Sequence, residues 1–82
     1  MNDSASNDRV IEVFARVLAI APERVTDDLR YASIPEWDSI AHMSVVAGLE
    51  DAFGVMIDMD DVIDMNSVGK AREILAKHGT SA

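Results

Sequence analysis

The chain has 82 residues, with 7 Lys and Arg against 15 Asp and Glu, and a formal net charge of -8, which fits one domain with one modest core. This acidity argues against nucleic acid and anionic membranes as partners, because both would repel the chain, and it points to proteins with basic surfaces. The lack of cysteine excludes disulfides, thiol nucleophiles and cysteine-ligated zinc. The sequence has no signal peptide and no apolar run of about 18 residues, so we expect a cytoplasmic protein.

The first predicted element is a helix that follows a small, polar and disordered tail at residues 1–7. Apolar residues recur with helical spacing from Asp8 onward, and Ser6, Asn7 or Asp8 is expected to cap the helix. Pro22 is expected to stop it, because proline lacks the backbone N–H that a helix needs. The apolar stripe consists of Val10, Val13, Phe14, Val17 and Leu18.

Residues 23–37 are predicted to form a long loop between the first and second helices. Such a loop is uncommon in a small domain unless it is functional or pinned by packing. Trp37 is expected to be at least partly exposed and to help docking, and the alternative is a Trp that pins the loop to the bundle. The side chains predicted to pin the loop are Val25, Leu29, Tyr31 and Ile34.

A second helix is predicted to start at Asp38 or Ser39, with Asp38 as its N-cap and Gly54 just past its last turn. Its apolar residues predict one wide inward stripe. That stripe contains Ile40, Met43, Val46, Ala47 and Phe53, widened by Val45, Leu49 and Ala52. We expect Phe53 to be a core residue, together with Phe14, Leu18, Val46 and Leu49.

Two further helices complete the predicted fold. Asp58 is expected to cap a short third helix that runs through Met65, and Asn66 or Ser67 is expected to cap a fourth. A disordered tail is expected at residues 79–82. The sequence therefore predicts an all-α four-helix bundle over residues 8–78, with three main helices and one short helix.

Two groups of polar side chains are candidates for a catalytic or a metal site. Asp38, Ser39 and His42 are close in sequence, but the strained G-x-S-x-G turn of a serine hydrolase is absent, so His42 is interpreted as a partly exposed helix residue. The acidic run at residues 58–64 fails the calcium-loop pattern at its fifth, sixth and twelfth positions, which favours a solvated acidic face. We therefore expect neither an enzyme active site nor a metal site.

Ser39 is the remaining candidate, because it opens a helix directly behind an N-capping acid. The dipole and free N–H groups at a helix start favour an attached phosphate. An ordinary serine at a helix start is the alternative. The methionines of the second half are either core residues or an adaptable apolar surface, with Met56 and Met59 the better surface candidates.

The chain resembles the acyl carrier protein family, whose members carry a D-S-L motif at the start of the second helix. The matching residues are Trp37-Asp38-Ser39-Ile40, Val46, Leu49-Glu50-Asp51 and Phe53-Gly54-Val55. Upstream and downstream, the likeness continues in Asp28-Leu29, Ile57, Asp60-Asp61 and Ser67-Val68, so that it spans roughly residues 8–78.

The resemblance implies that Ser39 receives 4′-phosphopantetheine from coenzyme A and that the thiol of this arm holds an acyl or aminoacyl group as a thioester. It implies a carrier without an active site, acting as a monomer. Its partners would be a phosphopantetheinyl transferase, acyl-activating enzymes or acyltransferases, and ketosynthases or other thioester-using enzymes. The implied recognition residues are Asp38 and Ile40 for the transferase, the acidic Glu50, Asp51, Asp60 and Asp61, and the apolar Met43, Ala47 and Met56.

The chain also departs from carriers of fatty acid synthesis. Pro35-Glu36-Trp37 precede Asp38, and Ala41 and Ser44 stand where acids are common in the family. The W-D-S-[LI]-x-H variant resembles free-standing carriers of specialised pathways, such as polyketide, hybrid peptide or modified-sugar biosynthesis, and the opening Met1 fits a free-standing chain. The alternative from another class is an acidic helical adaptor that docks basic proteins and is never modified.

Overall fold

The structure is a computed structural model, and it describes residues 8–79. It contains four α-helices, α1 (Arg9–Leu18), α2 (Ser39–Phe53), α3 (Met59–Asp64) and α4 (Val68–Lys77), and one 3-10 helix, η1 (Pro22–Arg24). The all-α prediction is confirmed: the described part has no β-strand, and α3 is the short helix, with six residues. No helix in this part is long and apolar enough to cross a membrane. The predicted tails lie outside the described residues, except for Gly79.

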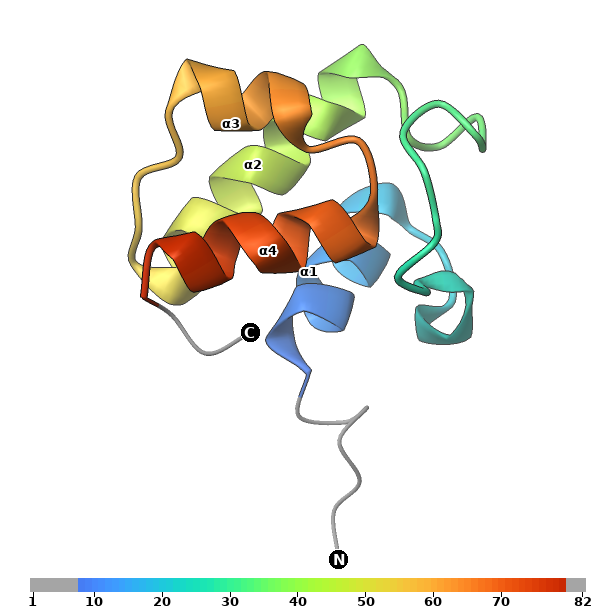
Figure 1. The fold of residues 1–82 in the computed structure, drawn as a ribbon. Coiled ribbons are helices and arrows are strands. Elements are labelled where there is room, and N and C mark those ends of the chain that lie inside the picture. The colour runs from blue at the N-terminus through green and yellow to red at the C-terminus, as the bar shows by residue number, and fades with distance from the viewer. Residues whose placement is uncertain (1–7, 80–82) are drawn as a thin grey trace, which may run out of the picture.

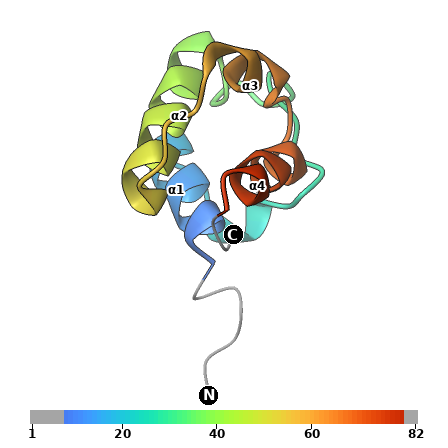
Figure 2. The same cartoon turned by 60° about the vertical axis from the view of Figure 1, so that its left-hand side comes forward.

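The four helices surround one core (Figures 1 and 2). α1 packs against α2, α4 runs across the front of the molecule in Figure 1, and α3 lies at the top. Each helix and the long loop contribute side chains to the core. The fully buried ones with the largest volume are Trp37, Phe14, Leu49, Met65, Leu75, Val10, Val45 and Val68.

The helix starts are fixed by local capping bonds of the kind that the sequence predicts. Asp38 Oδ1 accepts the Ala41 amide at 2.8 Å, and Asp58 Oδ1 accepts the amide of Asp61 at 3.0 Å. Asp8 and Ser67 cap α1 and α4 in the same way. Each bond satisfies one backbone donor that has no partner inside its helix, which is why these residues begin the helices.

The helix ends depend on the left-handed backbone conformation. Gly54, with φ of 65°, ends α2 as predicted, because glycine adopts this conformation without steric strain. α1 ends at Leu18, where Ala19 takes the same conformation, with φ of 57°. The prediction that Pro22 stops α1 is therefore wrong, since Pro22 instead begins η1, where its fixed φ suits a helical first position.

The long loop is held by backbone hydrogen bonds to the junction between α3 and α4. The Tyr31 amide donates to the Asn66 carbonyl at 3.0 Å, and the Val68 amide donates to the Leu29 carbonyl at 3.0 Å. These bonds join segments that lie far apart in the sequence (Figure 1). The loop is therefore a fixed part of the fold.

The side chains that were expected to pin the loop do so to different extents. Val25 is buried, Leu29 and Ile34 are half-buried, and Tyr31 is exposed. A second close approach is made by backbone alone, where the Gly69 amide donates to the Asp27 carbonyl at 2.8 Å. A Cβ at position 69 would lie 3.1 Å from that oxygen, so only glycine fits there without displacing the loop.

The predicted inward face of α2 is partly wrong. Val45, Val46 and Leu49 are buried, whereas Ile40, Met43 and Ala47 are exposed. The expected stripe was too wide, because only part of the circumference of α2 faces α1 and the core. Phe53 is half-buried rather than in the core.

Phe53 lies at the end of α2, beside the start of α1. The guanidinium of Arg9 lies 5.2 Å from the centre of its ring, a cation–π distance. Arg9 also donates to the carbonyl of Ala52, near the negative end of the helix dipole. The end of α2 is therefore closed by a charged side chain of α1, which covers the ring that the sequence placed in the core.

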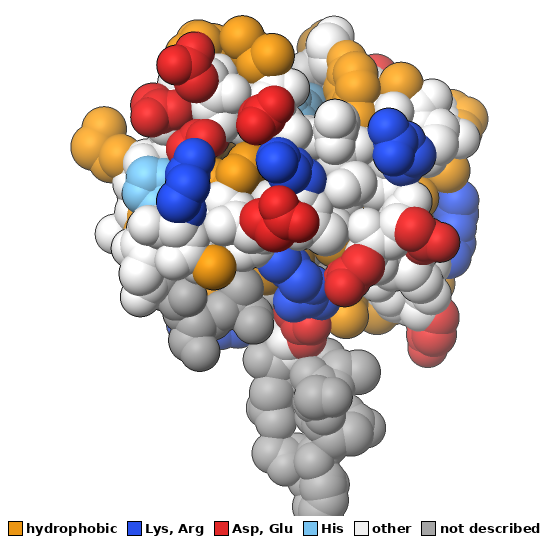
Figure 3. Space-filling view, in the orientation of Figure 1, with side chains coloured by type: hydrophobic (Ala, Val, Ile, Leu, Met, Phe, Trp, Pro, Cys, Tyr) orange, Lys and Arg blue, Asp and Glu red, His pale blue; other side chains and the backbone are white. Residues whose placement is uncertain are grey.

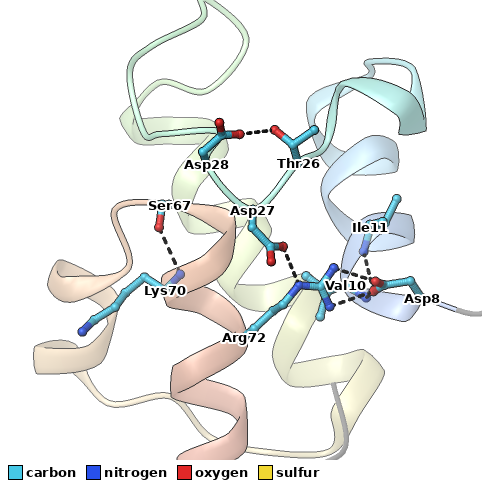
Figure 4. A network of polar contacts seen from close by, with 9 residues as sticks. All are labelled: Asp8, Val10, Ile11, Thr26, Asp27, Asp28, Ser67, Lys70 and Arg72. Atoms are coloured by element: carbon cyan, nitrogen blue, oxygen red, sulfur yellow. Dashed lines mark hydrogen bonds and ion pairs between the residues drawn. The ribbon is translucent and has the colours of Figure 1, made fainter. Parts of the chain in front are cut away.

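Arg72 of α4 connects the start of α1 to the long loop through side-chain hydrogen bonds (Figure 4). Its guanidinium donates to both carboxylate oxygens of Asp8, the cap of α1, and to Asp27 Oδ1 in the loop at 2.8 Å. Partial burial pushes the pKa of Asp8 upward, but the bonds from Arg72 and from two backbone amides outweigh it, so the pKa lies below its usual value. One cation thus stabilises a helix cap and the loop at once.

Candidate functional site

Ser39 is the first residue of α2, and its side chain is exposed. The amides of Ser39 and Ile40 have no acceptor inside the helix, because they belong to its first turn. Asp38 holds this turn by its bond to Ala41. The site therefore offers an accessible hydroxyl at the positive end of a 15-residue helix, an environment that favours a phosphodiester.

The other serines of the described part differ from Ser39 in their surroundings. Ser33 donates its hydroxyl to the Arg30 carbonyl at 2.6 Å, and Ser67 uses its hydroxyl to cap α4. Ser44 is exposed but lies in the middle of α2. Among residues 8–79, only Ser39 combines an exposed hydroxyl with a helix start and with no side-chain hydrogen bond.

Trp37 is buried, so the prediction that it is at least partly exposed is wrong. Its side chain has 0% exposure. It packs edge-on against Phe14 of α1, with ring centres 5.1 Å apart, and against Tyr31. The alternative that the sequence left open, a Trp that pins the loop to the bundle, is the observed arrangement. A fully buried side chain presents no surface to a partner.

His42 explains how a loop Trp can be buried. The indole Nε1–H of Trp37 donates to His42 Nδ1 at 3.0 Å, and His42 Nε2 lies 2.9 Å from the carbonyl oxygen of Val62 in α3. A buried indole needs an acceptor for its N–H, and His42 supplies one. A Trp followed five residues later by a His in the first helical turn is a signal that the sequence interpretation missed.

The remaining apolar recognition residues are exposed as the resemblance implies. Ile40 is 79% exposed and Met56 is 86% exposed, and Met43 and Ala47 are also exposed. Met59 of α3 is exposed too, as expected for a surface methionine. Large apolar side chains at this exposure are typical of protein-binding surfaces when they are grouped.

The acidic recognition residues divide into two kinds. Asp51 and Asp60 are exposed, and neither forms an ion pair within residues 8–79. Glu50 is half-buried, and its Oε2 accepts the Ile57 amide at 2.9 Å. Its carboxylate therefore also holds the turn that follows α2.

Asp61 does not belong to the solvated acidic face, which corrects the sequence-based prediction. Only 6% of the residue is exposed. Lys77 Nζ donates to its Oδ1 at 2.7 Å, and His78 Nε2 lies 3.5 Å from its Oδ2. The hydrogen bond from Lys77 lowers the pKa of Asp61 below its usual value. Asp61 connects α3 to the end of α4, so its charge is matched inside the fold.

The charges of the chain are segregated along the sequence. Residues 31–69 hold 8 of the acidic residues and no Lys or Arg, whereas the rest of the chain holds 7 acidic and 7 basic residues. We call residues 31–69, which contain α2 and α3, the acidic segment. Figure 3 shows acidic and apolar side chains together over α3 at the top of the molecule, with lysines and arginines below them over α4.

A hollow of about 310 Å³ lies between the first turns of α2, the helix α3 and the loop. Its lining is mostly apolar and rich in methionine. The residues that line it are Tyr31, His42, Met43, Met59, Val62, Ile63, Met65 and Asn66. The hollow begins one helical turn from Ser39, because His42 lies three residues after it.

Comparison with known proteins agrees with these features. Residues 8–73 match the model of the phosphopantetheine attachment site family. The chain is 28% identical over 78 residues to an acyl carrier protein of Lactobacillus johnsonii, a match that covers 95% of this chain and 98% of the relative. It is 32% identical over 76 residues to an acyl carrier protein of Renibacterium salmoninarum, covering 88% of this chain and 94% of the relative.

An acyl carrier protein of an Arthrobacter species is 30% identical over 76 residues, with the same coverage of 88% and 94%. The family model and these relatives indicate a covalently attached 4′-phosphopantetheine and a carrier role without catalysis. With a matched attachment-site model over most of its length and an exposed serine at the start of α2, this chain belongs to the acyl carrier protein family.

Proposed function

We propose that Ser39 is the residue to which the 4′-phosphopantetheine is attached. The observation that carries this proposal is the exposed hydroxyl of Ser39 at the first position of α2, which has no hydrogen-bond partner within residues 8–79 and lies in the part of the chain that matches the family model. Once attached, the group supplies a thiol on an arm, which carries acyl or aminoacyl groups as thioesters. The tether raises the effective concentration of the carried group at each partner enzyme.

The residues around Ser39 have three tasks in this proposal. Asp38 fixes the first turn through the Ala41 amide and so presents the hydroxyl outward. The free amides of the first turn stabilise the negative phosphodiester. The exposed side chains of Ile40 and Met43 form an apolar contact for the transferase, which needs to approach this end of α2.

The exposed acids of the acidic segment attract basic partners. Asp51 and Asp60 have no ion-pair partner within the described residues. Their negative charges therefore contribute to the electrostatic potential that an approaching partner experiences. The apolar hollow beside His42 accepts the apolar part of a short carried group. We further propose that the phosphopantetheinyl transferase, the loading enzyme and the thioester-using enzymes all bind the surface formed by the exposed residues of the acidic segment.

The carrier is proposed to serve a specialised pathway, of the polyketide, hybrid peptide or modified-sugar kind. The support is the start of α2, whose first turn contains no acidic residue after the Asp38 cap. Loading rates by an acyltransferase of fatty acid synthesis and by acyl-activating enzymes of specialised pathways test this. Faster loading by the fatty acid enzyme would contradict the proposal.

The attachment site is tested by intact mass spectrometry after incubation with coenzyme A and a promiscuous phosphopantetheinyl transferase. The chain is expected to gain the mass of one phosphopantetheinyl group. The Ser39→Ala variant is expected to lose this gain while its helical circular dichroism is unchanged. Ser44→Ala is the matched control, because it removes an exposed hydroxyl from the same helix, and it is expected to be modified normally.

Two results would change the proposal. A mass gain in the Ser39→Ala variant would move the attachment to another serine. No gain in the unaltered chain with several transferases would favour the adaptor function, in which the acidic face docks basic proteins without modification.

A further inference from the structure

His42 lies where three parts of the fold meet. It is in the first turn of α2, three residues after Ser39, and its ring is tilted by 28° from the plane of Trp37, with ring centres 5.9 Å apart. Its two nitrogens face Trp37 of the loop and the Val62 carbonyl of α3. The ring also forms part of the wall of the apolar hollow.

The two hydrogen bonds determine the protonation of the ring. The indole N–H of Trp37 can only donate, so His42 Nδ1 must be an unprotonated acceptor. The Val62 carbonyl can only accept, so Nε2 must carry the proton. The observed geometry is therefore that of the neutral imidazole with its proton on Nε2.

The bridge matters most for α3. This helix has six residues, which is too short to be stable without tertiary contacts. The Val62 carbonyl belongs to its last turn, where it also accepts a long bond of 3.4 Å from the Met65 amide. The bond from His42 gives this carbonyl a second and shorter partner and connects α3 to the turn that contains Ser39.

We propose that His42 is a positioning residue whose neutral form holds α3 and Trp37 against the first turn of α2, and whose protonation releases Trp37 and loosens the surface beside Ser39. Histidine ordinarily changes its charge between about pH 8 and pH 5. A proton on Nδ1 would leave two donors facing each other at the Trp37 contact, which cannot form a hydrogen bond. The consequence for modification rests on the assignment of Ser39, whereas the bridge itself does not.

The ring of His42 forms no ion pair in the described part of the chain. Tyr31 meets the ring edge-on at 5.1 Å, and the loop otherwise presents the indole. On α2, the carboxylate of Asp38 is bonded to the Ala41 amide. On α3, Asp61 is next to Val62 but is bonded to Lys77 and near His78 of α4.

The bridge is tested by NMR on the full chain between pH 8 and pH 5. At pH 8 the imidazole ¹⁵N shifts of His42 are expected to report the Nε2–H tautomer. The single indole N–H resonance, from Trp37, is expected to shift and to exchange faster with water as His42 gains its proton. An Nδ1–H tautomer at pH 8, or an indole resonance unmoved by the titration of His42, would overturn the proposal without any variant.

Two variants sharpen the test. The amide of His42→Gln has one acceptor and one donor group but no titratable proton, so its indole resonance is expected to be insensitive to pH. His78→Gln is the matched control, because it removes the other histidine, which faces Asp61. It is expected to keep the pH dependence of the unaltered chain. The reverse pattern would place the pH dependence at His78.

The effect on function is tested by measuring the rate of phosphopantetheine attachment across the same pH range. The rate of the unaltered chain relative to that of His42→Gln is expected to fall as His42 gains its proton. A ratio that is constant with pH would limit His42 to a structural role. If neither protein is modified at any pH, the Ser39 assignment fails, and the NMR result still decides the bridge.

Discussion

The acidic segment and the remainder of the fold use charge in opposite ways. In the remainder, acidic and basic residues are equal in number, and Arg72 forms ion pairs with Asp8 and Asp27. In the acidic segment, Asp51 and Asp60 form no ion pair within the described residues, and the segment also exposes large apolar side chains such as Ile40. The first pattern stabilises a fold, and the second suits a surface that meets other proteins.

The division is not strict along the sequence. Trp37 and Asp61 belong to the acidic segment but are buried and bonded inside the fold. The comparison therefore teaches that each residue of the segment has to be assigned by its contacts. Variants that separate stability from partner recognition test the assignment residue by residue.

The largest effect is expected for Trp37→Ala. Removal of a buried aromatic side chain costs about 3–5 kcal/mol, a large part of the roughly 5–15 kcal/mol that stabilises a small domain. The free energy of unfolding, measured in urea, is expected to fall by this amount. Met56→Ala is the control within the same segment, because it truncates a side chain that is 86% exposed, and its effect is expected within about 0.5 kcal/mol. Equal urea midpoints for the two variants would contradict the burial of Trp37.

The helix starts and the end of α2 could be predicted from sequence, because they depend on local contacts. The caps Asp38, Asp58 and Ser67 each accept a hydrogen bond from an amide three residues later. Gly54 adopts the left-handed conformation that ends α2 without help from distant contacts. The position of Ser39 at the start of α2 follows from its cap. These features need no knowledge of the rest of the fold.

The residues that sequence analysis placed wrongly depend on distant partners. Asp61 is buried because Lys77, 16 residues later, reaches its carboxylate. Trp37 is buried because Phe14 and His42 enclose it from two helices. Periodicity within one helix cannot identify such partners, since they are fixed only when the helices pack.

The next effect is expected for Arg72→Met, which removes the cation that pairs with Asp8 and Asp27 outside the acidic segment. The substitution leaves the half-buried Asp8 without its cation, and hydrogen bonds to charged groups contribute about 1.5–3 kcal/mol each. The free energy of unfolding is expected to fall by about this amount. Arg24→Met is the matched control, because Arg24 lies 3.9 Å from Glu36 at the surface, where an ion pair contributes about 0–1 kcal/mol. A larger loss in the control would locate the stabilising pair elsewhere.

A smaller effect is expected for the pH dependence of stability through Asp8. Its folded pKa lies below its unfolded value of about 3.9. Asp8 therefore stabilises the fold at pH values above about 4, and this contribution is lost as the pH falls through the folded pKa. Asp8→Asn keeps a capping side chain but loses the charge at the start of α1, so it is expected to cost about 0.3–1 kcal/mol at pH 7 and much less at pH 3.

The control for this prediction is Asp60→Asn, which removes an exposed carboxylate of the acidic segment. Its cost in stability at pH 7 is expected to be smaller than that of Asp8→Asn, because Asp60 forms no ion pair within residues 8–79. Urea midpoints at the two pH values decide the comparison. A loss for Asp8→Asn that is as large at pH 3 as at pH 7 would show that its charge does not contribute.

The smallest effect is expected for single charge reversals on the partner-facing surface. Asp51→Lys changes an exposed side chain that forms no ion pair within residues 8–79, so stability is expected to be unchanged. One exposed charge pair with a partner contributes up to about 1 kcal/mol. The rate of phosphopantetheine transfer is therefore expected to fall no more than about fivefold at low salt. Glu50 is unsuitable for this test, because its carboxylate holds the Ile57 amide.

Glu73→Lys on α4 makes the same change of net charge outside the acidic segment, at a side chain that is 73% exposed. If recognition depends on where the charge lies, Asp51→Lys slows the transfer and Glu73→Lys does not. If it depends on net charge alone, both variants slow it equally. Because the Debye length shortens from about 10 Å at 0.1 M salt to about 3 Å at 1 M, the effect of Asp51→Lys should disappear at high salt. A transfer rate that remains after the charge is screened then measures the contribution of the apolar side chains, Ile40 and Met43, which salt does not screen.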